Sequence, residues 1–264
     1  MNKVLIICGP TATGKTKFAL ELAKKFNGEL VSADSRQVYI GNDLETGKDF
    51  HLNTDHIKIW LLDILQQGEE FSVSAWRHLA QEAIKDILSQ GKLPIVVGGS
   101  GLYIKSLVQD LPDIDVPFDK KLRKKWENKS AKELFDYLKS INLKKANSMN
   151  ASDSQNPRRL IRAIEITQHP SLTSQDASRR LDLREGMGVS YLQIGLTSSK
   201  ENLVAKIKKR VVDRGIAKSF EAKEVAIMKK QVVWFKKQPL VTWFDVTKPD
   251  WQAQAIKLVS SWYN

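Results

Sequence analysis

The chain has 264 residues, 42% of them hydrophobic, which is enough for one large domain or for a core domain that carries a smaller one. It has a single cysteine, Cys8, which excludes a disulfide framework and a cysteine-based zinc site within the chain. Its formal net charge of +12 favours a polyanionic partner such as nucleic acid, although a soluble basic protein without such a partner would have the same charge. No apolar run approaches the ~18 residues of a membrane span and the N-terminus has no signal-peptide pattern, so we expect a cytoplasmic protein without a membrane partner.

The first part of the chain alternates strands and helices. The apolar run from Val4 to Cys8 is typical of a strand buried on both faces of a parallel sheet. Apolar residues at helical spacing then predict a helix over Thr16–Phe26. The same patterns predict strands at residues 30–33, 59–62 and 93–97 and an amphipathic helix over residues 74–90. This order indicates an α/β fold, with a P-loop-type parallel sheet core and helices on both faces.

The pattern changes near residue 114. From Asp119 to about Gln168 the sequence is highly charged, helical in character and free of strand signals, and a loop rich in Ser, Thr and Asp follows to about Arg184. Strand character returns at residues 191–196 and 241–245, before a last helix. We therefore expect an α/β core made of residues 1–114 and 190–264, interrupted by a helical, basic insertion domain over residues 115–189.

A glycine-containing turn joins the first predicted strand to the first predicted helix. Its sequence matches the phosphate-loop pattern G-x-x-x-x-G-K-[ST] in the required position. Glycines let backbone N–H groups curl around phosphate oxygens, Lys15 adds a full positive charge, and the Thr16 hydroxyl is placed to ligate Mg²⁺. The pattern does not distinguish a nucleoside triphosphate from another ligand with a pyrophosphate group. The predicted phosphate-binding residues are Gly9, Pro10, Thr11, Ala12, Thr13, Gly14, Lys15 and Thr16.

A carboxylate, Asp34, follows the second predicted strand. In an open parallel sheet, residues beyond the carboxyl end of a strand face the ligand crevice, so Asp34 is expected to face the same cleft as Lys15. The alternative role for a lone aspartate is to cap a turn or a helix. The polar residues Arg36, Gln37 and Tyr39 come directly after it and favour a role in function.

Five segments resemble, in order, the sequence blocks of the tRNA dimethylallyltransferase family. They are Gly9–Thr16, Asp34–Gly41, Leu93–Tyr103, Asn156–Glu165 and Lys229–Phe235. The resemblance spans nearly the whole chain. It implies an enzyme that moves a dimethylallyl group from dimethylallyl diphosphate to N6 of an adenine next to the anticodon of tRNA, giving isopentenyladenosine.

The resemblance also implies roles for individual residues. The phosphate loop would hold the pyrophosphate of the prenyl donor together with Mg²⁺ as the cofactor. Asp34 is implied as the general base at the adenine amino group, and Arg210 as the charge that neutralises the leaving pyrophosphate. Ser100 matches a position at the junction of donor and acceptor. The family usually has threonine there, and the hydroxyl is retained in Ser100.

Contacts with tRNA are implied around the adenine site and on the insertion. The expected partner is the anticodon stem-loop, bound by a monomeric protein. The residues that match tRNA-contacting positions are Asp34, Ser35, Arg36, Gln37, Ser100, Arg123, Arg158, Arg159, Leu160, Ile161 and Arg162.

Three alternative functions fit parts of the sequence. A small-molecule P-loop kinase would explain the phosphate loop and Asp34, but not the basic insertion. An adenylate isopentenyltransferase would share the fold and use a free nucleotide, whereas the arginines at residues 158–162 favour tRNA. The third alternative is a tRNA-binding relative without catalysis. It rests on the stretch after Val211, where family members usually carry a longer helical region.

Overall fold

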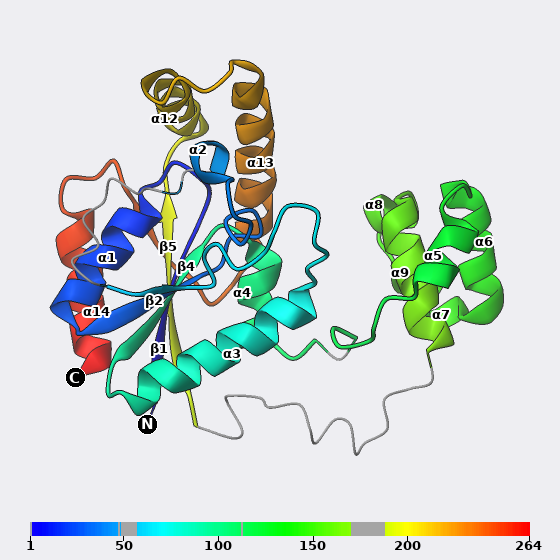
Figure 1. The fold of residues 1–264 in the computed structure, drawn as a ribbon, viewed down its shortest axis with the longest axis horizontal. Coiled ribbons are helices and arrows are strands. Elements are labelled where there is room, and N and C mark those ends of the chain that lie inside the picture. Colours follow the sequence, from blue (N-terminus) through cyan, green and yellow to red (C-terminus); the bar gives the residue numbers. More distant parts are fainter. Residues whose placement is uncertain (1, 47, 49–56, 112, 170–187) are drawn as a thin grey trace. The chain divides into compact units, whose positions relative to one another are not determined.

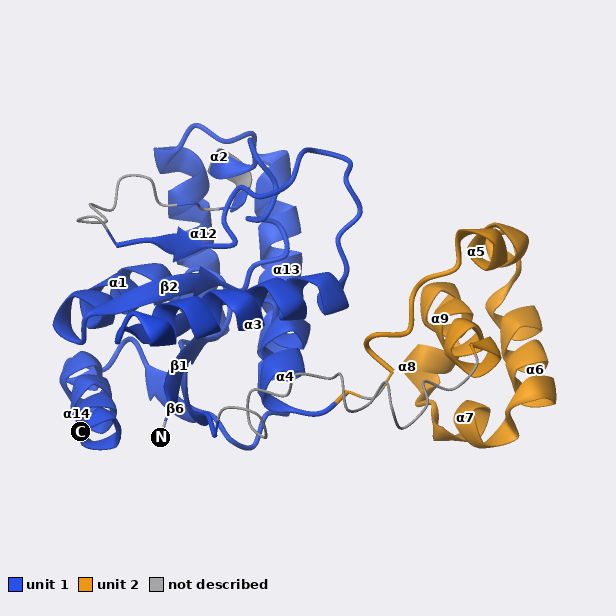
Figure 2. Ribbon diagram, turned by 60° about the horizontal axis from the view of Figure 1, so that its bottom comes forward, with its two compact units in different colours: residues 1–110, 182–264 blue, residues 111–181 orange. Residues whose placement is uncertain are grey.

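A computed structural model describes residues 2–46, 48, 57–111, 113–169 and 188–264 (Figure 1). The chain forms two compact units (Figure 2). Unit 1 comprises Met1–Asp110 and Asp182–Asn264, and unit 2 comprises Leu111–Leu181. Unit 2 overlaps most of the insertion expected over residues 115–189. Apart from His169, the loop predicted up to Arg184 lies outside the described residues.

Unit 1 contains a sheet of six strands in the order β3-β2-β4-β1-β5-β6, and every neighbouring pair is parallel. The predicted α/β fold with a parallel sheet is therefore confirmed. The strands are β1 (Lys3–Cys8), β2 (Gly28–Ser32), β3 (Ile59–Trp60), β4 (Leu93–Gly98), β5 (Ser190–Thr197) and β6 (Thr242–Asp245).

The strand predicted over residues 59–62 has half of its expected length. The apolar run over residues 59–62 predicts four strand residues, but β3 ends at Trp60. Leu61 has a φ of 60° and Asp63 a φ of 55°, so the backbone enters the left-handed region and leaves the extended conformation that pairing requires. The Leu61 side chain is still buried, so an apolar residue is needed there although the backbone is not that of a strand.

Helices cover both faces of the sheet (Figure 1). Side chains alternate along β1, so Val4 and Ile6 pack against α3 and α4 while Leu5 and Ile7 pack against α1 and α14. The helices of unit 1 are α1 (Lys15–Lys25), α2 (Asp43–Thr46), α3 (Val73–Ser89), α4 (Gly101–Val108), α12 (Lys200–Asp213), α13 (Ser219–Phe235) and α14 (Trp251–Tyr263).

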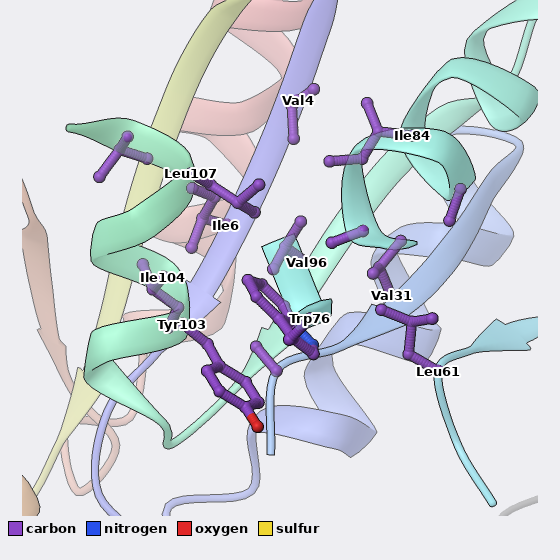
Figure 3. Packing of buried hydrophobic residues seen from close by; sticks show 14 of the residues in the cluster. Val4, Ile6, Val31, Leu61, Trp76, Ile84, Val96, Tyr103, Ile104 and Leu107 are labelled. Atoms are coloured by element: carbon purple, nitrogen blue, oxygen red, sulfur yellow. The ribbon is translucent and has the colours of Figure 1, made fainter. Parts of the chain in front are cut away.

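An aromatic pair anchors one face of this core. Trp76 on α3 stacks on Tyr103 on α4 with ring centroids 4.5 Å apart (Figure 3). The indole N–H of Trp76 donates a hydrogen bond to the Ser32 carbonyl at 3.0 Å, so this large side chain is buried without an unsatisfied polar atom. The contact ties α3 to the end of β2, where Asp34 follows.

The described residues of unit 2 form helices joined by turns and short irregular segments, with no strand among them. Its core contains Trp126, Leu134, Leu138, Leu160 and Ile164. Its helices are α5 (Lys120–Trp126), α6 (Ala131–Ile141), α7 (Leu143–Ser148), α8 (Ala151–Ser154) and α9 (Pro157–Gln168). In the described parts of both units, no helix has the length and apolar character that crossing a membrane requires.

Candidate functional site

The phosphate loop connects β1 to α1 through a backbone that needs glycine. Gly9 has a φ of 136°, and a Cβ there would lie 2.2 Å from the Leu196 carbonyl oxygen. Gly14 has a φ of 84° and precedes the first residue of α1. These conformations direct the loop around the N-terminus of α1, where backbone N–H groups without helical partners favour a bound anion.

Lys15 supplies the charge at this helix terminus. Its ammonium group donates a hydrogen bond to the Pro10 carbonyl at 2.7 Å, so the side chain folds back over the loop. Burial is the main cause that lowers the pKa of Lys15, and Arg210 also lowers it, while Asp34 and Cys8 act in the opposite direction; together they bring this pKa from 10.5 to about 8. Because the buried ammonium group is poorly solvated, a polyanionic ligand beside it would stabilise its charged form.

Asp34 faces the same cavity as Lys15, as predicted. One of its carboxylate oxygens also accepts a hydrogen bond from the Arg36 backbone N–H at 2.9 Å. The capping role and the cavity role that the sequence offered as alternatives therefore coexist in the same side chain. A carboxylate held by one oxygen keeps the lone pairs of the other oxygen for chemistry.

Ser100 brings the second glycine segment against the loop that carries Asp34. Its hydroxyl accepts a hydrogen bond from the Ser35 N–H at 2.9 Å and lies 3.2 Å from the Ser35 hydroxyl. This approach requires Gly98, because a Cβ there would lie 2.1 Å from the Ala33 carbonyl oxygen. Two sequence blocks more than sixty residues apart thus form one wall of the site.

Arg210 and Arg36 are joined by a residue that the sequence analysis missed. Arg210 donates to one carboxylate oxygen of Glu224 and Arg36 donates to the other, each at 2.5 Å. Arg210 also donates to the Thr11 hydroxyl at 3.3 Å. Glu224 lies on α13 and is only 3% exposed. A single glutamate on a lysine-rich helix gives no sequence signal that it is buried.

Gln231 is the second missed residue. Its side-chain oxygen accepts from the Thr11 N–H at 2.8 Å, and its amide nitrogen donates to the Gly99 carbonyl at 3.0 Å. It therefore joins the phosphate loop to the second glycine segment. The block Lys229–Phe235 drew attention to this region of α13, but its basic and aromatic character indicated nothing about the amide.

Some of these residues line a cavity of about 290 Å³, whereas Ser35, Arg36, Ser100 and Glu224 are not among its lining residues. One part of the wall is polar and charged, and another is aliphatic. The polar lining residues include Thr11, Lys15, Thr16, Asp34, Gln37, Lys48, Arg210 and Gln231, and the aliphatic ones are Leu20, Leu30, Ile59, Leu62 and Val97. A ligand that combines a charged head with a short hydrocarbon chain matches this lining.

Lys48 has a supporting role in this wall. It is 5% exposed, and its ammonium group donates to the Tyr39 carbonyl and to Asp43, both at 2.9 Å, and to Asp63. These contacts fasten the segment after Asp34 to the end of β3. Gln37, which donates to the Thr46 carbonyl at 3.2 Å, is held in the same segment.

The predicted arginines of unit 2 have different surroundings. Arg123 donates two hydrogen bonds to the buried carboxylate of Glu165, at 2.6 and 3.0 Å. Arg162 donates to Glu165 and to the carbonyls of Asp113, Val116 and Pro117. Burial acts to raise the pKa of Glu165, but hydrogen bonds from Arg123, the Asp119 N–H and Arg162 outweigh it and lower that pKa below its ordinary value.

The other predicted residues of α9 divide between surface and core. Arg158 and Arg159 are exposed, and Arg159 forms an ion pair with Asp153. The side chains of Leu160 and Ile161 lie in the hydrophobic core of unit 2. The tRNA contact that the resemblance implies for these two residues stays a prediction.

The comparisons with known proteins agree on one family. The family model described as IPP transferase matches residues 37–232. The tRNA dimethylallyltransferase of Acetivibrio thermocellus is 42% identical over 231 residues, which cover 84% of this chain and 72% of that protein. The tRNA dimethylallyltransferase of Anoxybacillus flavithermus is 34% identical over an alignment that covers 93% of this chain and 91% of that protein.

Solved structures give the same result. The full-length tRNA isopentenylpyrophosphate transferase from Bacillus halodurans superposes with a TM-score of 0.65 at 29% identity, covering 99% of this chain and 96% of that one. A eukaryotic dimethylallyltransferase acting on tRNA has a TM-score of 0.79 and covers 99% of this chain and 79% of that one, but at 20% identity it supports the fold alone.

Proposed function

Because the chain belongs to the IPP transferase family, we propose that it transfers a dimethylallyl group from dimethylallyl diphosphate to N6 of an adenine next to the anticodon of tRNA. The observation that carries the proposal is the shared cavity of Lys15 and Asp34. It has a cationic phosphate loop, an aliphatic wall and a carboxylate. Those are the three environments that a prenyl diphosphate and an amine nucleophile need.

The pyrophosphate of the prenyl donor is assigned to the phosphate loop. The backbone N–H groups at the start of α1, the ammonium of Lys15 and the guanidinium of Arg210 supply the positive potential. The hydrogen bond between Arg210 and Thr11 supports this assignment, since it holds the guanidinium at the loop. As the bond between the prenyl carbon and oxygen breaks, these groups stabilise the charge that develops on the pyrophosphate.

Asp34 is assigned as the general base. The exocyclic amine of adenine is a weak nucleophile, and a carboxylate that takes its proton as the new N–C bond forms lowers the barrier. One C–O bond breaks, one N–C bond forms, the pyrophosphate leaves with the electron pair, and the proton moves to Asp34. The Ser35–Ser100 contact supports the assignment because it fixes the loop on which Asp34 lies.

The metal assigned to the reaction is Mg²⁺. Thr16 is one of the residues that line the cavity, and Mg²⁺ characteristically combines one or two protein oxygens with phosphate oxygens and water. Among the described residues no group of three His, Cys, Asp or Glu side chains is arranged to hold an ion. When bound, the ion would neutralise charge on the pyrophosphate.

The anticodon stem-loop is assigned to both units. The target adenine must leave its stack to reach Asp34, which costs a few kcal/mol, and contacts with the phosphate backbone offset that cost. The exposed Arg158 and Arg159 of unit 2 supply such contacts in this proposal. We also propose that the protein acts as a monomer and, because tRNA is its substrate, in the cytoplasm.

The test is mass spectrometry of tRNA nucleosides from a bacterial strain that lacks its own enzyme and expresses this chain. Isopentenyladenosine is the expected product, and an empty-vector strain is the control. The purified protein should then prenylate tRNA without consuming ATP. Phosphate transfer from ATP would support a kinase, prenylation of free adenylate would support the nucleotide-specific enzyme, and tRNA binding without product would support a non-catalytic relative.

A further inference from the structure

Glu224 connects the two halves of the reaction site. Its carboxylate binds Arg36 with one oxygen and Arg210 with the other, while the glutamate itself is 3% exposed. Arg36 lies two residues after Asp34, and its backbone N–H donates to the Asp34 carboxylate. Arg210 donates to Thr11 in the phosphate loop. A continuous path of hydrogen bonds therefore joins the loop of the base to the loop of the prenyl donor through one buried carboxylate.

The charges of the three side chains explain why this arrangement is stable. Burying a carboxylate costs several kcal/mol unless charged partners compensate, and here both oxygens have one. Each guanidinium donates one hydrogen bond to the carboxylate, and Arg210 donates a second one to Thr11. Without the carboxylate, two guanidinium groups of like charge would face each other beside Lys15, and their repulsion would move them from these positions.

Glu224 reaches this position because α12 and α13 pack together. Leu203 and Ile207 of α12 meet Met228 of α13 in a small core of their own, and all three side chains are fully buried. Arg210 is three residues after Ile207 and Glu224 is four residues before Met228, so both are placed by this packing. The carboxylate is thus fixed by helices rather than by a loop.

We propose that Glu224 is a positioning residue for prenyl transfer. This inference rests on the function proposed above. Glu224 holds the guanidinium of Arg210 at the phosphate loop and, through Arg36, holds the loop of Asp34 at the distance that transfer requires. Its contribution lies in the alignment of donor and acceptor, because Lys15 and the backbone N–H groups of the loop still bind the pyrophosphate when Glu224 is replaced.

The experiment uses Glu224→Gln in the full-length protein. Glutamine accepts a hydrogen bond from one arginine but presents its own N–H₂ to the other, so one guanidinium is released. At saturating tRNA and dimethylallyl diphosphate, the single-turnover transfer rate should fall about 10- to 100-fold, since small misplacements have effects of this size. The affinity for inorganic pyrophosphate with Mg²⁺, measured by calorimetry, should stay the same or increase, because a negative charge near the loop is removed.

The matched control is Glu221→Gln on the same helix. Glu221 is 3.9 Å from Lys208 in a partly exposed ion pair, so transfer should stay within about two-fold of wild type. Glu224→Asp keeps the charge and shortens the reach, and it should slow transfer even if the glutamine variant fails to fold.

The outcomes separate the inference from the proposed function. If the wild-type protein transfers the prenyl group and both Glu224 variants do so at the same rate, the positioning role is overturned and the proposed function is not affected. A parallel loss of transfer rate, pyrophosphate affinity and thermal stability would assign Glu224 to the fold alone. If the wild-type protein transfers no prenyl group, the proposed function fails and the inference fails with it.

Discussion

Each unit of the protein buries one glutamate between two arginines. In unit 1 Glu224 binds Arg36 and Arg210, and in unit 2 Glu165 binds Arg123 and Arg162. Both glutamates are 3% exposed. All four arginines also lie at positions that the family resemblance assigns to substrate. Sequence alone gives no reason to treat the two clusters differently.

The remaining contacts of the arginines distinguish the clusters. Arg210 lines the cavity and directs its second hydrogen bond at the phosphate loop. Arg162 donates its other hydrogen bonds to three backbone carbonyls between Asp113 and Pro117, which fastens the entry segment of unit 2 to α9. We therefore propose that the unit 1 cluster serves the reaction and that the unit 2 cluster serves the fold. An arginine that matches a sequence block of the family therefore does not have to contact a ligand.

The largest effect is expected for Asp34→Asn, which tests whether chemistry resides in unit 1. Asparagine keeps the size and the capping ability of aspartate but accepts no proton, so single-turnover transfer should fall by about 10²- to 10⁴-fold. The affinities for tRNA and donor should change little. A rate within a few-fold of wild type would mean that Asp34 only caps its turn. Partial recovery at high metal concentration would instead assign it to Mg²⁺.

Lys15→Ala removes the main point charge from the phosphate loop. Transfer should fall on the order of 10² or more, because the charge that develops on the leaving pyrophosphate loses its nearest cation. Binding of tRNA to unit 2 should be unchanged, which a filter-binding titration would measure. Normal turnover of dimethylallyl diphosphate in this variant would remove Lys15 from the mechanism.

Glu165→Gln tests the unit 2 cluster by its stability. The free energy of unfolding should fall by about 2 kcal/mol, since two charged hydrogen-bond donors lose their buried partner. The pKa of Glu165 is lowered from 4.5, so its stabilisation is complete above that pH and is lost as the pH falls through the lower, folded-state value. The melting temperature, measured from about pH 7 to about pH 3, should thus fall less steeply toward acid pH in the variant than in the wild type.

The contrast with Glu224→Gln makes this test decisive. The glutamine variant of Glu165 should transfer prenyl groups at a rate within a few-fold of wild type once tRNA is saturating. If Glu165→Gln slows single-turnover transfer as much as Glu224→Gln does, the two clusters do not differ in the way proposed.

The smallest effect concerns the exposed arginines of α9. We expect the replacement of Arg158 and Arg159 by alanine to weaken the salt dependence of tRNA binding. The slope of log Kd for tRNA against the logarithm of the salt concentration should become flatter by roughly 0.7 to 0.9 for each phosphate that an arginine no longer neutralises. Lys257→Ala on α14 is a control that removes an exposed charge from unit 1. An unchanged slope in the double variant would move the phosphate-binding role to other residues.

Local sequence patterns predicted the parts of the site that are local. The phosphate loop, its position between β1 and α1, and the approach of Asp34 to Lys15 all depend on short motifs and on the geometry of parallel strands. The length predicted for β3 was wrong because Leu61 is buried but left-handed.

The parts that escaped prediction depend on distant partners. Glu224 meets Arg36 across 188 residues, and Gln231 meets Thr11 across 220. Neither residue type is unusual on a surface helix, and only the packing of α13 on the core makes them functional. The same limit applies to Arg162, whose backbone partners at residues 113–117 carry no side-chain signal.

The insertion also has a consequence for biosynthesis. The central strand β1 pairs with β4 on one edge and with β5 on the other, where Lys3 is opposite Ser190. A growing chain completes all of unit 2 before β5 is made, an interval on the order of ten seconds at about 5–20 residues per second. Until then an apolar strand edge has no partner, and such edges recruit other chains. We therefore expect the nascent protein to be prone to aggregation while its insertion is being translated.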